Sequence, residues 1–345
     1  MKDYYEARQY IGLSSLAYDV IEHDKDEFMT KPSRQGFINR IIESFAEDAQ
    51  ASIDLAVEKE TERLTRELAA ISDSEAKTTI IRTLAEAYRN DLVQHFAEYP
   101  KEQQFRFQLN ERNYEARLQW TDVNGYYGGH PSRYYSAVLE EYARKSYYER
   151  ETIALRSLID QIQMCIDTAK LILITLRNAD NRKYEIRPYA ILPDANHNFH
   201  YLVGYSKISK SDYPERIVSF RLSRIGSIEI RHSRSGRITV EQRAEISKRI
   251  ESVGVQFLLQ NPEFIRVKLT ESGVRKYETQ ILMRPPVQIK QPCDDGSWIY
   301  TFDCTPLQAE YYFFKFGADA EVLAPDALRK RFLDGYLRAI DVYMT

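Results

Sequence analysis

The sequence predicts a multidomain α+β protein, and three observations carry that prediction. The chain has 345 residues, which is more than one small core accommodates. Apolar residues recur at helical spacing through residues 1–165, and from Lys170 onward they alternate as they do in strands. Residues 253–345 mix both patterns. We therefore expect a helical N-terminal part, a small and strongly bent sheet, and an α+β module at the C-terminus.

Residues 1–50 are predicted to form a strand followed by two helices. Ile11 and Leu13 share one face of a short alternating run, and Ser15 stands where the cap of a helix is expected. The second helix follows a Pro-Ser-Arg tripeptide, and its apolar residues recur at i, i+3, i+4 and i+7. This spacing predicts a helix with one buried face.

Residues 101–146 repeat that order, with a second Pro-Ser-Arg tripeptide before the last helix. Alternation gives the strand one polar face, made by Arg106, Gln108 and Asn110. Each copy resembles half of a ribbon-helix-helix unit, whose strand pairs with another strand to make a ribbon for a groove of DNA. Two copies in one chain could pair with each other. Ordinary helical hairpins with edge strands would give the same pattern.

The remaining segments follow in order along the chain. Residues 51–100 are predicted as a charged helical spacer, and residues 147–165 as a bridging helix that begins at Ser146, where Glu149 completes a capping box. Strands separated by turns occupy residues 166–240. The C-terminal module is predicted to run strand, helix, strand, strand, helix, strand, helix.

The charge and cysteine content limit the classes of protein to consider. Twelve Lys or Arg and six Asp or Glu lie between Arg177 and Arg237, a local net charge of +6 in a chain of net charge −3. Such a basic region would direct a polyanion to one place. Three scattered cysteines predict neither a disulfide framework nor a zinc site. No signal peptide or membrane-spanning run is recognisable, so we expect a cytoplasmic protein.

Three stretches resemble a known family. "RPYAIL" from Arg187, "HYLVGY" from His200 and "FRLSRIGSI" from Phe220 resemble the WYL domain, an SH3-like β-barrel of bacterial regulators. The C-terminal module, with "YYFFKFGADAEVLAPDALRKRF", resembles the extension that usually follows a WYL domain. Taken whole, the chain resembles accessory proteins encoded beside the RNA-targeting effector of type VI-D CRISPR systems. The resemblance implies a cytoplasmic homodimer that binds single-stranded RNA and stimulates the effector. The aromatic run "YYFFKFG" is predicted to expose more aromatic surface than one small module can bury, so we expect the C-terminal module to join the two chains.

The resemblance also implies a set of binding residues. They are Arg187, Tyr189, His200, Tyr201, Arg221 and Arg224. His200 stands where the family has tryptophan, and Ser223 stands where it commonly has aspartate between the two arginines. Arginine offers a planar fork that matches phosphate oxygens, and tyrosine offers a ring for a base. The alternative is that the tyrosines are half-buried barrel residues and the arginines pair with carboxylates.

The sequence predicts a binding protein without catalytic residues, metal or cofactor, because no phosphate-binding glycine loop, zinc helix or nucleophile elbow occurs in it. The leading hypothesis is the RNA-binding accessory protein. The alternative is a transcriptional regulator that binds DNA through Arg106, Gln108 and Asn110 and senses a nucleotide or nucleic acid in its WYL domain. A third hypothesis is an interaction scaffold that binds no nucleic acid.

Overall fold

The protein is described by a computed structural model that covers residues 8–344 except 98–99, 122–130, 178–181, 195, 197, 209–213 and 260–261. The chain divides into two compact units, Met1–Ser157 and Leu158–Thr345. Both helices and antiparallel sheets are present, which confirms the predicted α+β class. Among the described helices, none is long and apolar enough to cross a membrane.

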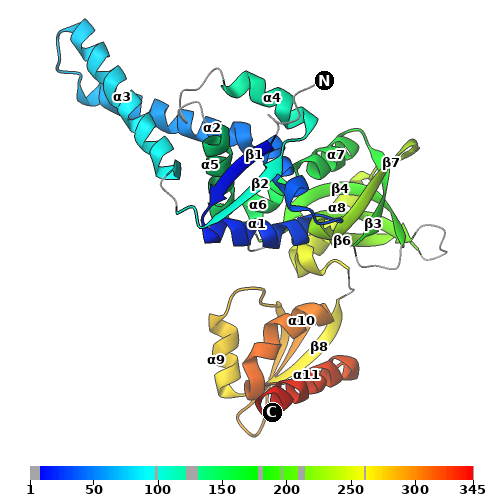
Figure 1. The fold of residues 1–345 in the computed structure, drawn as a ribbon. Helices are drawn as coiled ribbons and strands as arrows, with labels where there is room; N and C mark the ends of the chain where they lie inside the picture. Colours follow the sequence, from blue (N-terminus) through cyan, green and yellow to red (C-terminus); the bar gives the residue numbers. More distant parts are fainter. Residues whose placement is uncertain are drawn as a thin grey trace. The chain divides into compact units, whose positions relative to one another are not determined.

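In the N-terminal unit, two strands far apart in the sequence form a two-stranded antiparallel ribbon (Figure 1). Strand β1 (Arg8–Leu13) pairs with β2 (Gln103–Gln108), and Tyr10 lies opposite Arg106. Alternate residues of β1 are buried, including Ile11 and Leu13 at 1% exposure each. The ribbon therefore has one face in the core and one face in solvent, as the alternation predicted.

The N-terminal unit also contains α1 (Ser15–Phe28), α2 (Arg34–Glu67), α3 (Ser74–Ala97), α4 (Glu111–Thr121) and α5 (Pro131–Arg144). Helices α1 and α5 pack against strand β1 of the ribbon. Helix α1 is capped by Ser14, whose side chain accepts a hydrogen bond from the backbone of Ala17. The prediction of Ser15 as the cap was wrong by one residue, because Ser14 is the last residue with extended backbone.

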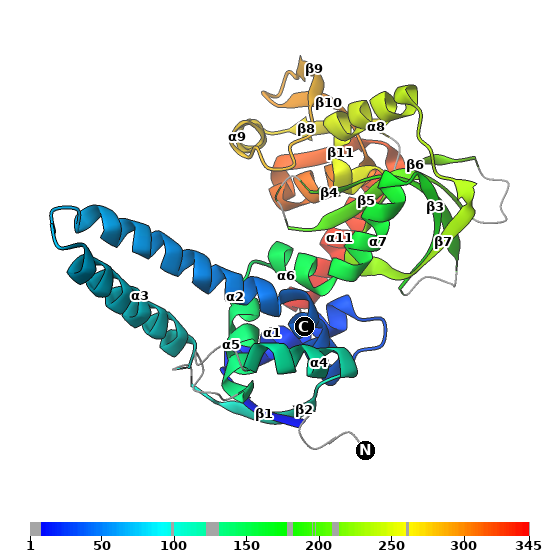
Figure 2. The same ribbon diagram turned by 90° about the horizontal axis from the view of Figure 1, so that it is seen from above.

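Helices α2 and α3 lie side by side as a long hairpin (Figures 1 and 2). Ile53 and Val57 of α2 pack with Ala85 of α3 in one small cluster. The region predicted as a helical spacer thus contains the second half of α2 and all of α3.

A buried polar cluster joins α1 to α5 and to α6 (Tyr147–Ala154). Asp24 is 0% exposed and accepts hydrogen bonds from the Tyr142 hydroxyl at 2.8 Å and from Nε of Arg150 at 2.7 Å. Burial, and then the Asp24 charge, raise the pKa of Tyr142, so the phenol stays protonated and donates. Because a buried carboxylate needs such partners, this cluster fixes the three helices to one another.

The capping box predicted at the start of α6 is confirmed, because the Ser146 and Glu149 side chains each bond the other's backbone. The bridging helix is not continuous, however. Helix α6 ends at Ala154 with Leu155 as its C-cap, and α7 (Arg156–Asp167) follows.

Five strands of the second unit form one antiparallel sheet in the order β6-β5-β4-β3-β7. They are β3 (Lys170–Leu176), β4 (Lys183–Pro193), β5 (His200–Ile208), β6 (Arg216–Arg221) and β7 (Ile225–Ser235). Within the described ranges β6 and β7 do not pair with each other, so the sheet stays open where a closed SH3-like barrel was predicted. Gly204 lies opposite a bulge in β4, where a Cβ would come 2.2 Å from the carbonyl oxygen of Arg187.

Helix α8 (Val240–Val253) and the 3₁₀ turn η3 (Val255–Phe257) cover part of this sheet. Ile246 and Phe257 are buried there against Val203 and Tyr205 of β5. No helix was predicted for the residues that form α8. Together, α8 and η3 give the open sheet a covered face.

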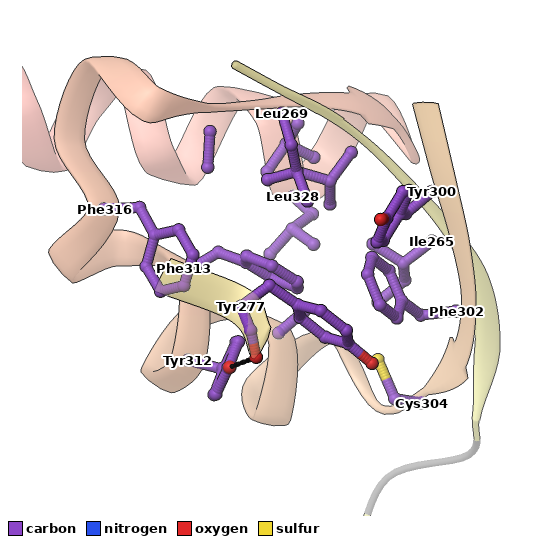
Figure 3. Close-up of a cluster of buried hydrophobic side chains, with 14 of the residues drawn as sticks. Ile265, Leu269, Tyr277, Tyr300, Phe302, Cys304, Tyr312, Phe313, Phe316 and Leu328 are labelled. Atoms are coloured by element: carbon purple, nitrogen blue, oxygen red, sulfur yellow. Dashed lines mark hydrogen bonds between the residues drawn. The ribbon is translucent and has the colours of Figure 1, made fainter. Parts of the chain in front are cut away.

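The C-terminal module follows the predicted order of elements. It contains β8 (Glu263–Leu269), α9 (Glu271–Thr279), β9 (Val287–Pro292), β10 (Trp298–Cys304), α10 (Pro306–Phe313), η4 (Phe314–Asp319), β11 (Ala320–Ala324) and α11 (Asp326–Met344). The sheet order is β11-β8-β10-β9, with aromatic residues dominating the core (Figure 3). We expected the "YYFFKFG" run to expose its aromatic surface. That expectation was wrong for Tyr312, Phe313 and Phe316, which are at most 2% exposed.

Candidate nucleic-acid interface

A pocket of about 1050 Å³ lies along the edge strand β6. The residues that line it include members of the five-stranded sheet, of η3 and of α10. Six aromatic residues line it: Tyr184, Phe199, Tyr201, Phe220, Phe257 and Tyr311. Five basic residues line it as well: Arg182, Lys207, Arg216, Arg221 and Arg224. Aromatic surface and positive charge are therefore combined in one recess.

The Arg-Leu-Ser-Arg spacing places two of these arginines around one tight turn. Strand β6 ends at Arg221, and the 3₁₀ turn η2 (Leu222–Arg224) follows with Leu222 and Ser223 buried. The two residues between the arginines are therefore packed inside the protein, and both arginines lie beside the pocket. The Arg221 guanidinium carbon lies 3.6 Å from the centroid of the Phe199 ring, and the Arg224 side chain is exposed.

Asp194 is the single acidic residue among the described residues that line the pocket. It is 4% exposed, and its carboxylate accepts a hydrogen bond from the backbone N–H of Asn198 at 2.7 Å. The backbone N–H of Asp194 donates to the carbonyl of Phe199. Asp194 therefore closes the turn that presents Phe199, while the basic residues dominate the charge of the pocket.

Tyr201 is brought together with the two predicted arginines, as it pairs in register with Arg221 across β5 and β6. Arg187, Tyr189 and His200 are not among the described residues that line the pocket. His200 is 7% exposed at the start of β5. The hydroxyl of Tyr189 lies 3.5 Å from that of Ser247 in α8, and its ring packs against the cluster under this helix.

Arg187 is held by the protein itself. Its guanidinium donates to both carboxylate oxygens of Glu215 at 2.8 and 2.5 Å, to the carbonyl of Arg237 at 2.8 Å and to Gln242 at 3.1 Å. It also lies over the ring of Tyr205. Arg187 is thus paired with a carboxylate, which is the alternative interpretation that the sequence left open for the arginines.

The polar face of the ribbon is only partly as predicted. Arg106 is exposed, and its guanidinium lies 5.9 Å from the centre of the Tyr10 ring. Gln108 ends β2 opposite Arg8. Asn110 lies beyond the strand, where its side-chain oxygen accepts from the backbone of Asn113 at the start of α4. The assignment of Asn110 to the ribbon face was wrong, because the strand ends at Gln108.

Arg182, Lys207 and Arg216 were missed as pocket residues. Arg216 and Arg224 are exposed, and within the described residues neither side chain takes part in a hydrogen bond or ion pair. Lys207 pairs with Glu185 at 3.5 Å. The excess of basic residues in this part of the sequence indicated a basic region, but it did not indicate which of these side chains would line the same pocket.

The fold and the pocket together suit an anionic ligand that carries flat rings, as a nucleotide or a nucleic-acid strand does.

Comparison with known proteins gives the class of the C-terminal module, since residues 261–336 match the WCX domain. These residues lie in the module where the sequence resembles the extension of WYL proteins, and that resemblance is confirmed. No curated protein matches the chain.

Eight solved chains match this one, and two of them are described here. One is a crystal structure of a CRISPR Cas-related protein, with a TM-score of 0.71 and 23% identity, covering 97% of this chain and 94% of that chain. The other is the proteasome accessory factor B/C (PafBC) of Arthrobacter aurescens, with a TM-score of 0.25 and 15% identity, covering 66% of this chain and 35% of that chain. The first likeness shows that the two chains share a fold.

Proposed function

We propose that this protein is a non-catalytic accessory protein of a CRISPR system that binds single-stranded RNA in the pocket beside β6. The observation that carries the proposal is the meeting of five basic and six aromatic residues in one recess. Arginines hold phosphates and aromatic rings stack on bases that a flexible strand can turn outward. A duplex keeps its bases stacked inside, so its rings cannot enter the recess.

The resemblance to type VI-D accessory proteins and the fold shared with a CRISPR Cas-related protein support the biological setting. In that setting, the protein acts in the cytoplasm and stimulates an RNA-guided effector that cleaves RNA. We further propose that the N-terminal unit is a ribbon-helix-helix pair fused in one chain, because β1 pairs with β2, helices α1 and α2 follow β1, and helices α4 and α5 follow β2. The five-stranded sheet is then an opened version of the SH3-like WYL barrel.

The binding preference tests this function. The protein should bind a single-stranded RNA of mixed sequence at least tenfold more tightly than duplex DNA of equal length, because only the single strand can place bases against the aromatic wall. Fluorescence anisotropy at one fixed salt concentration measures both affinities. Equal or tighter binding of random duplex DNA would refute the proposal, and no binding of either at low salt would favour an interaction scaffold.

A transcriptional regulator is the second candidate, and the exposed pair Tyr10 and Arg106 on the ribbon favours it. In that case the ribbon enters the major groove and the pocket senses a nucleotide or nucleic acid. The same assay separates the two candidates. Arg106→Ala should weaken duplex binding in a regulator and leave binding of single-stranded RNA unchanged in an accessory protein.

We also propose that the protein is a homodimer joined through α11. Four apolar side chains recur along one face of this helix at i, i+4, i+7 and i+11 and are 51–82% exposed: Leu333, Leu337, Ile340 and Met344. The opposite side of the helix is already used, since Leu328 and Phe332 are buried in the core of the module. A second copy of the same stripe would cover this one across a two-fold axis.

Light scattering at micromolar concentration should therefore give a mass near 81 kDa, twice the 40.5 kDa of one chain. Leu337→Asp should convert the dimer to a monomer, because it places a charge in the middle of the apolar stripe. Ala339→Asp is the matched control, since it adds the same charge about 200° around the helix. A monomeric wild-type protein, or a dimer that survives Leu337→Asp, would contradict the assignment.

A further inference from the structure

Tyr311 of the C-terminal module is far more exposed than the aromatic residues that follow it. The next two residues, Tyr312 and Phe313, are 0% exposed and lie in the core of the module (Figure 3). Tyr311 belongs to the same helix, α10, and is 65% exposed. Because its neighbours anchor the helix in the core, the backbone that carries Tyr311 is fixed. An exposed ring on a rigid element is suited to hold a flat ligand.

Helix α10 also contacts the five-stranded sheet. Leu307 lies one helical turn before Tyr311 and packs against the buried cluster that contains Val203 of β5 and Phe257 of η3. The ring centroids of Phe257 and Tyr311 are 6.3 Å apart, and the two ring planes make an angle of 47°. The sheet and the C-terminal module therefore meet at this point, and Tyr311 is an exposed residue beside it.

The register of the sheet places two of the predicted binding residues on the same side. Tyr201 lies opposite Arg221 across β5 and β6, and because side chains alternate along a strand, both share a face with Val203. Val203 belongs to the cluster that contains Phe257. Tyr201 and Arg221 therefore line the pocket on the side of the sheet where η3 and Tyr311 lie.

The chemistry of this side of the pocket fits a strand of nucleotides. The rings supply flat surfaces for bases, and the Arg221 guanidinium supplies positive charge for phosphate. Asp194 is the one carboxylate among the described lining residues, and it accepts a hydrogen bond from the backbone of Asn198. A single strand meets both requirements at once, since each of its units carries a base and a phosphate.

We propose that Tyr311 stacks on a base of the bound strand, so that the RNA-binding site extends from the five-stranded sheet onto the C-terminal module. This inference rests on the proposed RNA-binding function. It assigns to the module a direct contact with the ligand, in addition to its part in the dimer. Every base has a flat face, so the contact does not depend on the sequence of the strand.

Substitutions of Tyr311 test the contact by fluorescence anisotropy with a single-stranded RNA decamer of mixed sequence. Tyr311→Ala should weaken binding by about fivefold or more, because a base loses its stacking partner. Tyr311→Phe should stay within about twofold of the wild-type affinity, because it keeps the ring. Neither variant removes a charge, so the slope of log affinity against log salt should remain that of the wild-type protein.

A decamer with the same sugar–phosphate backbone but without bases gives the sharpest comparison. It keeps the phosphates that the arginines hold and offers nothing to stack. At low salt, Tyr311→Ala and the wild-type protein should bind this strand within about twofold of each other, because the stacking contact is absent from both complexes. An equal loss for both decamers would show that Tyr311 acts only by supporting the fold, and it would overturn the inference.

Phe264→Ala is the matched control. Phe264 lies on β8 of the same module, is 73% exposed and is outside the described lining of the pocket. This variant should bind the RNA decamer within about twofold of the wild-type affinity. If it weakens binding as much as Tyr311→Ala does, the effect belongs to exposed aromatic surface in general and not to this site.

Light scattering separates stacking from assembly, because Tyr311→Ala should keep the mass of the wild-type protein. A change of mass would place the ring in a contact between chains and would overturn the inference. RNA binding that is unchanged in Tyr311→Ala would also overturn it, while leaving the proposed function in place. If the wild-type protein does not bind the RNA decamer at low salt, the proposed function fails and this inference fails with it.

Discussion

Replacing Arg216 and Arg224 together by alanine should weaken binding of single-stranded RNA by more than tenfold, about 1–3 kcal/mol. Both side chains are exposed at the pocket, and within the described residues neither is engaged by a hydrogen bond or ion pair. If each contacts one phosphate, the slope of log affinity against log salt should fall by about 1.4. Anisotropy titrations at several salt concentrations measure both quantities.

The melting temperature of this double variant should change little, because exposed arginines contribute little to stability. Arg231→Ala with Arg234→Ala is the matched control. These two residues lie on β7 of the same sheet, outside the described lining of the pocket, and their removal changes the net charge equally. Equal losses of affinity in the two double variants would show that binding follows overall charge rather than this site.

Asp24→Ala should lower the free energy of unfolding of the N-terminal unit by about 3–5 kcal/mol. The Asp24 carboxylate is fully buried and is the partner of Tyr142 and Arg150, so its removal leaves the Arg150 charge, in a side chain 14% exposed, without its carboxylate. Tyr142→Phe should cost less, about 1–2 kcal/mol, since it removes one hydrogen bond and no charge. Urea denaturation followed by circular dichroism measures these differences.

Asp26→Ala is the control for this prediction. It removes the same charge from the same helix, but the Asp26 side chain is 67% exposed and lies 3.7 Å from Lys25. A surface pair of that kind contributes at most about 1 kcal/mol. If Asp24→Ala and Asp26→Ala destabilise the protein to the same extent, the buried cluster does not hold the three helices together.

Much of the fold could be predicted because its elements have strong periodicity and clear caps. The order of strands and helices in the C-terminal module followed from alternation and turns alone. Helix α8 was missed because only Ile246 and Val253 are buried along its 14 residues. Its capping box, in which Thr239 and Gln242 bond each other's backbone, was the signal that would have found it.

The candidate site was harder to predict because it depends on contacts between distant segments. Arg221 and Arg224 are placed by one short turn, so their spacing in the sequence was informative. Arg187 has the same guanidinium group, but once the sheet forms this group donates hydrogen bonds to Glu215, which is 28 residues away in the sequence. Arg216 and Gln256 reach the pocket through the register of β6 and the packing of η3, which no local pattern encodes.

The pairing of β1 with β2 inside one chain has a consequence for symmetry. A ribbon made by two identical chains has a two-fold axis, so the duplex it fits repeats itself about that axis. Here the opposing strands read Arg-Gln-Tyr-Ile-Gly-Leu and Gln-Gln-Phe-Arg-Phe-Gln, and Tyr10 faces Arg106 rather than another tyrosine. The solvent face of this ribbon therefore has a direction, and a partner lying along it meets a different set of groups at each end.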